Sequence, residues 1–424
     1  AYAAFGKEAF LNAIRRSQDY LLNAQLPGGY WQGELFIDCT LVADTICFRH
    51  WDGKIDEDWQ RKATNHLLSS QLPDGGWNIY HGGPSEANAT IKSYLALKLA
   101  GFPLTDPRMV KARSVAMNLG GVPKMNTFSK LYLALLGLFP WKYVPTIPCE
   151  VILIGKWCPL NFHEMSNWTR SMVVPLSIIN HFKPTRKLRN PVAIDELYPE
   201  DFQERELQLP RDPGVFSWRN LFLTTDKVLK LAEKMAQWGI HPFRRHALRK
   251  NEDWMLEHFE GADGLGAIWP SMLNSLIAMK AMGYEDDHPQ VLRAERELRK
   301  LENETETEIR IEPCHSPVWD TAIASVALCA SGVSPDHSKM KEAAKYLVSK
   351  EIRFRGDWKY KNDTGVEPSG WAFEHENKWS PDVDDSAMVL LALRGMQSGG
   401  KKFHQACFKR GLDWLLTFQC KGGG

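Results

Sequence analysis

The sequence predicts an all-α protein assembled from repeated helices, and three observations support this fold class. Apolar residues recur with the period of an α-helix in many segments. No stretch alternates apolar and polar residues convincingly, as a half-buried strand would. A helix followed by a glycine-containing turn and a tryptophan occurs more than once. The 424 residues are enough for two domains or for one large helical barrel.

The first predicted helix covers residues 8–24 and ends at a turn from Gln25 to Trp31, where a proline and paired glycines break the helix. The same arrangement returns about 46 residues later, at a turn from Gln71 to Trp77. Both turns have the pattern Gln-x-x-x-Gly-x-Trp, and this spacing is typical of paired-helix repeats. A further helix is predicted over residues 87–100.

Fainter copies of the turn occur at Trp358 and at Gln419, where three glycines end the sequence. We therefore expect the sequence to be a fragment that ends inside a repeat unit. The glutamine amide can bond the free backbone groups at the end of a neighbouring helix, and the tryptophan packs across the turn. This pattern predicts a structural role for Gln25, Trp31, Gln71, Trp77, Trp358 and Gln419.

Composition excludes several classes of function. The net charge of +1 gives no indication of a nucleic-acid partner. The eight cysteines form no Cys-x-x-Cys pair, which favours reduced thiols and an intracellular setting. The histidines lack metal-ligand spacing, so no metal is expected. Neither a signal peptide nor an apolar run of 18 residues is found, so nothing is expected to span a membrane. The 16 Trp, 19 Phe and 11 Tyr indicate a packed repeat, an aromatic-lined cavity, or both.

Residues 380–391 carry the densest group of candidate catalytic side chains. Asp382, Asp384 and Asp385 lie within four positions, directly before an apolar helical pattern. Pro381 and the acidic first turn predict a helix start here. Aspartates ionise near a pH of about 3.9 in water, but three packed together cannot all ionise cheaply, so we expect one to be held protonated. A general acid site and an aspartate-rich helix N-cap both fit this spacing.

Together, the repeated turns and the aspartate triplet resemble the squalene–hopene cyclases, the bacterial class II triterpene cyclases. The resemblance covers the whole chain. Its motifs are Gly-Tyr-Trp at 29–31, Ser-Pro-Val-Trp-Asp-Thr at 316–321, Gly-Trp-Ala-Phe at 370–373 and Pro-Asp-Val-Asp-Asp at 381–385. The combination of several Gln-x-x-x-Gly-x-Trp turns with an Asp-Val-Asp-Asp box is highly specific, whereas the box alone would be weak.

The resemblance implies an architecture of two α/α toroid barrels, with the second barrel incomplete in this chain. Residues 1–12 would be an N-terminal segment of the catalytic barrel, and residues 13–299 an inserted α/α barrel. Residues 300–424 would be a partial catalytic barrel carrying the aspartate box, entered through a solvated link at 300–312. The resemblance also implies monotopic attachment to the cytoplasmic face of the cell membrane and allows a homodimer. The apolar residues between 216 and 240 could supply the exposed surface for that attachment.

The implied activity is protonation of a terminal alkene of squalene, followed by cyclisation to hopene or hopanol through carbocations without a cofactor. By motif matching, Asp384 would be the proton donor, with Asp382 and Asp385 as its partners. Trp319 and Phe373 match aromatics that face cationic intermediates. We therefore expect Asp384 to line an apolar cavity together with these two aromatic side chains.

Trp168 matches a further aromatic of this kind. Aromatic faces stabilise a desolvated cation by about 0.5–2 kcal/mol each, without trapping it as a carboxylate would. An alkene is a far weaker base than an epoxide oxygen, so its protonation requires a strong neutral acid in a dry pocket. Cyclases that open an epoxide typically carry a cysteine after the aspartates. Ser386 holds that position here, which favours unoxidised squalene.

Three positions bear on how the reaction ends. Lys92 and Trp269 stand where well-known hopene cyclases have Glu and Gln, and Asp44 keeps a carboxylate where the family has Glu. Because that Gln helps to place the terminating water, Trp269 leaves the product open. The alternatives are cyclisation of another linear polyprenyl (a C35 terpenoid, oxidosqualene or a diterpenyl diphosphate, the last needing Mg²⁺) and a non-catalytic helical-repeat fragment that binds an apolar ligand.

Overall fold

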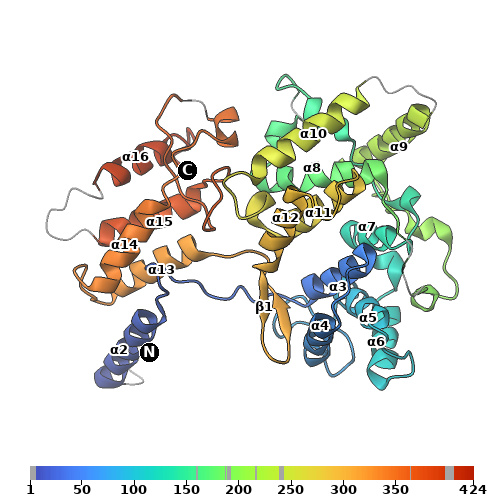
Figure 1. Ribbon diagram of the computed structural model, residues 1–424, viewed down its shortest axis with the longest axis horizontal. Helices are drawn as coiled ribbons and strands as arrows, with labels where there is room; N and C mark the ends of the chain where they lie inside the picture. Colours follow the sequence, from blue (N-terminus) through green and yellow to red (C-terminus); the bar gives the residue numbers. More distant parts are fainter. Residues whose placement is uncertain are drawn as a thin grey trace.

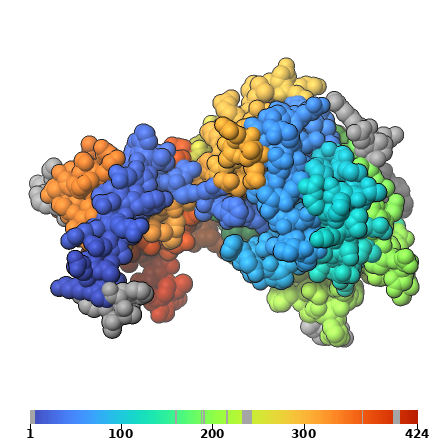
Figure 2. All heavy atoms as spheres, turned by 90° about the horizontal axis from the view of Figure 1, so that it is seen from below, coloured from blue at the N-terminus to red at the C-terminus, as the bar shows by residue number. Residues whose placement is uncertain are grey.

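A computed structural model describes residues 6–158, 161–186, 188, 192–214, 217–237, 243–362, 364–396 and 405–424. The fold is all-α, as predicted, with the helix-pair architecture of the α/α barrels. Figures 1 and 2 show two lobes joined by a narrower waist. One lobe contains α3 to α12, and the other contains α2 together with α13 to α16.

The first lobe is built from inner and outer helices. Inner helices bury side chains around most of their circumference, and outer helices bury one face. The inner helices include α3 (Thr40–Asp52), α5 (Ala87–Leu99), α8 (Asn167–Phe182) and α11 (Trp269–Ala281). The outer ones include α4 (Glu57–Ser69), α6 (Pro107–Asn118), α10 (Arg244–Phe259) and α12 (Pro289–Arg299), and α7 (Thr127–Leu135) and α9 (Trp218–Gln237) complete the set.

Short 3₁₀ turns carry the chain between several of these helices. They are η1 (Val122–Lys124), η2 (Trp141–Tyr143), η3 (Cys149–Leu153), η4 (Phe162–Glu164), η5 (Asp195–Leu197), η6 (Glu204–Leu207), η7 (Leu265–Ala267) and, in the second lobe, η8 (Asp357–Tyr360). The other helices of the second lobe are α2 (Lys7–Ala24), α13 (Pro317–Ala330), α14 (Ser338–Ser349), α15 (Val383–Gly395) and α16 (Gln405–Leu416).

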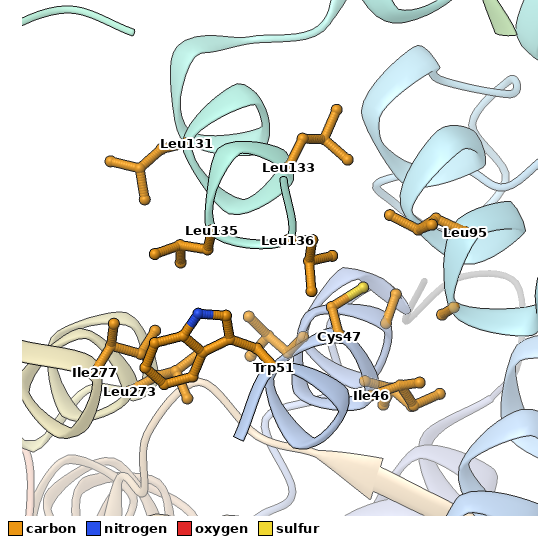
Figure 3. Close-up of a cluster of buried hydrophobic side chains, with 14 of the residues drawn as sticks. Ile46, Cys47, Trp51, Leu95, Leu131, Leu133, Leu135, Leu136, Leu273 and Ile277 are labelled. Atoms are coloured by element: carbon orange, nitrogen blue, oxygen red, sulfur yellow. The ribbon is translucent and has the colours of Figure 1, made fainter. Parts of the chain in front are cut away.

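Each lobe has its own hydrophobic core. The first core takes its buried residues from 39–311, and the second takes Trp31 and residues from 318 to 407. In the first core, Leu135 and Leu136 at the end of α7 lie near Trp51 of α3, with Leu273 of α11 close by (Figure 3). Leu21 of α2 packs against the second core, so the chain passes from one core to the other between 31 and 39 and returns between 311 and 318. The division into domains at residues 13 and 300 stays a prediction.

The tryptophan turns share one hydrogen-bonding geometry. Trp31 Nε1 donates to the Leu21 carbonyl at 2.7 Å, and Trp77 Nε1 donates to the Leu67 carbonyl at 2.7 Å. Their backbone N–H groups donate to threonine hydroxyls in inner helices, at 3.0 and 3.1 Å respectively. The indole thus satisfies a carbonyl that the last turn of the outer helix leaves free, and the hydroxyl fixes the turn to the next helix.

The glutamine side chains of these turns connect neighbouring units. Gln25 Nε2 donates to the carbonyls of Gly29 and Lys339, and Gln71 Nε2 donates to those of Gly75 and Arg108. Gln419 Nε2 donates to the carbonyl four residues later, that of Gly423, at 3.0 Å, as Gln25 and Gln71 do within their own turns.

In the second lobe this geometry belongs to Trp371 and not to the predicted Trp358. Trp371 Nε1 donates to the Leu347 carbonyl at 2.7 Å, and its N–H donates to Ser386 Oγ at 2.9 Å. Trp358 is half-buried and packs edge-on against Trp414, with ring centroids 5.7 Å apart. The turn after α14 is longer than the pattern allows, so the tryptophan lies further along the chain.

The expected link at 300–312 is partly a β-hairpin. Strand β1 (Glu302–Glu304) pairs antiparallel with β2 (Ile309–Ile311). Ile309 and Ile311 are buried, while Arg310 between them points the other way and pairs with Glu34. The glutamates between 302 and 308 are exposed or half-buried, as expected, but the pairing of this link into two strands was not predicted. The alternation is only three residues long, too short to stand out in the sequence.

Candidate active site

The three box aspartates lie at the N-terminal end of α15, as the sequence predicts. Asp382 is the N-cap residue, and its Oδ1 accepts the Asp385 N–H at 2.9 Å. The Asp382 N–H donates in turn to the Trp371 carbonyl at 3.1 Å. The box is therefore fixed directly to the tryptophan turn of the second core.

Adjacent aspartates of the box have different environments. Asp385 is 2% exposed, whereas the Asp384 side chain is exposed. Successive helix positions point about 100° apart, which explains the difference. The described residues thus do not enclose Asp384 in the cavity that was expected.

Burial raises the pKa of both Asp382 and Asp385. The Asp382 charge adds to the rise at Asp385, and the two carboxyls form a coupled pair. A proton shared between them avoids two buried negative charges at one place. The raised pKa values favour one protonated carboxyl in this pair, and Asp382 is also the N-cap of α15.

The two aromatic side chains predicted for the cavity lie together. The rings of Trp319 and Phe373 have centroids 6.4 Å apart, and the Val318 N–H donates to the Phe373 carbonyl at 3.3 Å. Trp319 is in the first turn of α13, and Phe373 follows Trp371, the residue that bonds Asp382. Both rings are half-buried. The structure thus brings this pair to the same end of the second core as the aspartate box.

Trp168 and Trp269 belong to the first lobe. Trp168, which is 39% exposed, is in the first turn of α8, and Trp269 begins α11 and is buried. Ser171 Oγ and Ser271 Oγ lie 3.0 Å apart and join these two helix ends. A hydrogen bond between Asn167 and Ser380, next to Trp168 and Pro381 respectively, connects this part of the first lobe with the chain entering the box.

Asp44 and Lys92 form a buried ion pair in the first lobe, with Nζ 2.7 Å from Oδ2. Burial raises the pKa of Asp44, and the charge of Lys92 opposes that rise. The Lys92 ammonium also lies 5.6 Å from the Tyr132 ring centroid, and Tyr132 Oη is 3.2 Å from Asn274 Oδ1 in α11. A polar cluster thus extends from α3 to the helix that Trp269 begins, and sequence reasoning missed its last two members.

A second buried charge cluster joins the two lobes and was also missed. Asp357 Oδ2 lies 3.2 Å from Arg170 Nη2 of α8 and 3.2 Å from His258 Nε2 of α10. Trp254 and Trp379 stack on the His258 ring, with centroid distances of 3.7 and 4.0 Å. Single charged residues tens of positions apart leave no periodic signal, so only the fold reveals this contact.

Residues 371–382, which enter the box, pair with the turn at 260–266 of the first lobe. The Asp263 N–H donates to the Glu376 carbonyl at 2.7 Å, and the Lys378 N–H donates to the Gly261 carbonyl at 2.9 Å. Trp379 Nε1 donates to the Glu260 carbonyl at 2.9 Å. These bonds make the position of the aspartate box depend on both lobes.

Comparison with known proteins agrees with this architecture. The squalene-hopene cyclase N-terminal domain model matches residues 14–307, and the squalene-hopene cyclase C-terminal domain model matches residues 315–424. A dammaradiene synthase from Dryopteris crassirhizoma is 38% identical over 97% of this chain and 59% of its own length.

Two bacterial relatives are similar over the same part of the chain. Squalene–hopene cyclases from Alicyclobacillus acidocaldarius and Zymomonas mobilis are 33% and 32% identical, over 98% and 97% of this chain. The chain spans 59% to 64% of the length of these three relatives. Both family models, together covering both lobes, show that the chain belongs to the squalene-hopene cyclase family.

Proposed function

We propose that the protein to which this chain belongs cyclises squalene to a hopene- or hopanol-type triterpene, starting with proton transfer from Asp384. The observation that carries the proposal is the coupled Asp382–Asp385 pair next to exposed Asp384, at the end of the core where Trp319 and Phe373 lie together. No metal or cofactor enters the proposed chemistry.

The arrangement supports the chemistry as follows. Hydrogen bonding between the carboxyls of Asp382 and Asp384 lets the buried pair share its proton with the exposed side chain. A hydrocarbon lying on the exposed side of Asp384 would remove water and strengthen the acid. The cation formed next to it would meet the faces of Trp319 and Phe373, which stabilise charge without forming a bond.

The side chains at the predicted termination site allow a second candidate product. Trp269 is buried and carries no carboxamide, and Lys92 neutralises Asp44. Neither arrangement offers the water-binding amide expected from the resemblance. The 38% identity to a dammaradiene synthase therefore favours a dammaradiene as the second candidate product.

Membrane attachment is part of the proposal because squalene dissolves in lipid. Helix α9 exposes one apolar stripe, with Trp218 70% and Phe222 62% exposed and Leu221, Val228 and Leu231 in register. Of the predicted apolar stretch, Phe216 and Trp238 lie outside the described residues. No helix in the part of the chain that the structure describes is long and apolar enough to cross a bilayer. We propose that α9 docks on the cytoplasmic face of the cell membrane.

The test is product analysis by gas chromatography after the full-length protein is given squalene, compared with Asp384→Asn. We expect wild-type turnover and a loss of about 100-fold or more in the variant. Equal turnover by both would exclude Asp384 as the donor. Turnover only of oxidosqualene, a C35 polyprenyl or a diterpenyl diphosphate with Mg²⁺ would identify the other substrates, and binding without turnover would identify a non-catalytic role.

A further inference from the structure

Three buried oxygens close to the aspartate box have no hydrogen-bond partner among the described residues. They are Glu374 Oε1, Asn377 Oδ1 and Asp385 Oδ1, on side chains only 3%, 3% and 2% exposed. A buried acceptor without a donor costs about 1–3 kcal/mol. Three such acceptors in one region indicate a site that needs protons or a small hydrogen-bond donor.

Glu374 lies inside a closed loop that the box completes. The backbone bond from Asp382 to Trp371 closes the loop 371–382. Within it, Asn377 Nδ2 donates to Glu374 Oε2 at 3.2 Å, which leaves Oε1 of Glu374 free for another partner. The titratable groups that face Glu374 electrostatically are Asp382, Asp385 and Asp263, together with the Cys314 thiol.

The surroundings of Glu374 favour its protonated form at neutral pH. Burial raises its pKa to about 8, the negative charges of Asp382 and Asp263 add to the rise, and the bond from Asn377 opposes it. The carboxyl is therefore an O–H donor of the kind that the unpartnered oxygen of Asp385 requires.

We propose that Glu374 is a positioning acid that returns a proton to the Asp382–Asp385 pair after each catalytic cycle, through a water molecule held between Glu374 and Asp385. The inference rests on the proposed function. When Asp384 has given its proton to the alkene, the pair passes its proton to Asp384 through the hydrogen bond between Asp382 and Asp384. The O–H bond of Glu374 then breaks, the water passes one proton on, and a new O–H bond forms on the pair. Solvent then reprotonates Glu374 on the side of Asp263, whose half-buried carboxyl accepts the Glu376 N–H at 2.9 Å.

A return route behind the box is needed because of where the substrate lies. A hydrocarbon against the exposed side of Asp384 keeps water from that side until the product leaves. Glu374 is only 3% exposed and lies within the loop 371–382, so its carboxyl is covered by protein and not by the substrate. The aspartate box can then be reprotonated while the product is still bound.

Glu374→Gln tests this role because it keeps the shape and the hydrogen bonds but cannot carry the proton. In the full-length protein we expect a single turnover at the wild-type rate, since the box is already loaded, and a steady-state rate lowered about tenfold or more. Glu367→Gln is the matched control, because that side chain is 65% exposed and pairs with Arg353 at the surface. An infrared pH titration should show a protonated carboxyl that ionises near pH 8 in the wild type and is missing in Glu374→Gln.

Each other outcome overturns the proposal in a distinct way. Equal loss in the single turnover and in the steady state indicates a structural role, and an unchanged steady state excludes the relay. A wild-type titration without the carboxyl near pH 8 contradicts the protonated state. If the wild type does not turn over squalene, both the proposed function and the relay are excluded. If the wild type turns over squalene normally but Glu374→Gln loses both rates equally or keeps its steady-state rate, the relay alone is excluded.

Discussion

His258 and Asp357 meet across the two lobes, with Nε2 of the imidazole 3.2 Å from Oδ2 of the carboxylate. The other ring nitrogen, Nδ1, lies 2.8 Å from the Trp254 carbonyl. Both ring nitrogens therefore lie within hydrogen-bond distance of an oxygen. Together with Arg170, this places two basic side chains on one buried carboxylate between the lobes.

Replacing Asp357 by Asn should destabilise the chain strongly. Burial alone would raise the pKa of Asp357, but the hydrogen bond and charge of His258 and the charge of Arg170 outweigh it and hold that pKa below its usual value. The variant leaves the buried Arg170 guanidinium without its counter-charge, so we expect a loss of about 3–5 kcal/mol in urea unfolding at pH 7.

The pH dependence of this loss has a defined sign. Since the folded pKa of Asp357 is lowered, its contribution is present above the unfolded pKa and disappears as the pH falls below about 4. The difference between wild type and variant should shrink there. Asp413→Asn, at an exposed pair with Lys409, is the control and should cost below about 1 kcal/mol. An equal effect of the two substitutions would refute the inter-lobe role.

The buried pair of Asp44 and Lys92 provides a second prediction. Lys92→Met should cost about 3 kcal/mol at pH 8, because Asp44 is left buried without its counter-charge. The pKa of Asp44 is already raised by burial and should rise further, so the variant regains stability relative to wild type as the pH falls and Asp44 takes up a proton.

A double substitution checks this interpretation. Asp44→Asn combined with Lys92→Met removes both charges and should be within about 1–2 kcal/mol of the wild type in chemical denaturation at pH 8. A double variant as unstable as Lys92→Met alone would show that packing, and not the unpaired charge, causes the loss.

The same substitution should lower the free energy of unfolding by different amounts at Trp371 and at Trp358. Trp371→Phe removes the bond to the Leu347 carbonyl in a fully buried position and should cost about 2–3 kcal/mol. Trp358→Phe removes a long bond of 3.4 Å to the Phe354 carbonyl in a half-buried position, so about 1 kcal/mol or less is expected. Thermal unfolding compares the two. A larger cost at Trp358 would restore it as the tryptophan of the repeat.

The apolar stripe of α9 can be tested with lipid. Replacing both Trp218 and Phe222 by Ser should weaken co-sedimentation with anionic vesicles by about tenfold or more, because each removes exposed apolar area that would enter the bilayer. Tyr20, 73% exposed on α2, provides the control, and Tyr20→Ser should bind like the wild type. Unchanged binding of the α9 variant would exclude this helix as the membrane contact.

Sequence alone determined the helical class, the turns at Trp31 and Trp77, and the start of a helix at the aspartate box. These features are local: helix periodicity, glycine and proline at turns and an aspartate N-cap act within a few residues of each other. The same reasoning placed the third tryptophan turn at Trp358, because it assumed a fixed turn length that the loop before Trp371 does not keep.

Only the tertiary structure decided which aspartate of the box is buried and which buried charges meet. Asp384 and Asp385 are equivalent in the sequence, but the packing of α15 against the second core buries one and exposes the other. Glu374 likewise has its pKa raised first by burial, and the charges of Asp382, in the same loop, and Asp263, from the first lobe, add to that rise. Desolvation and the distance between charges depend on where side chains lie in the folded protein, and the local sequence does not determine those positions.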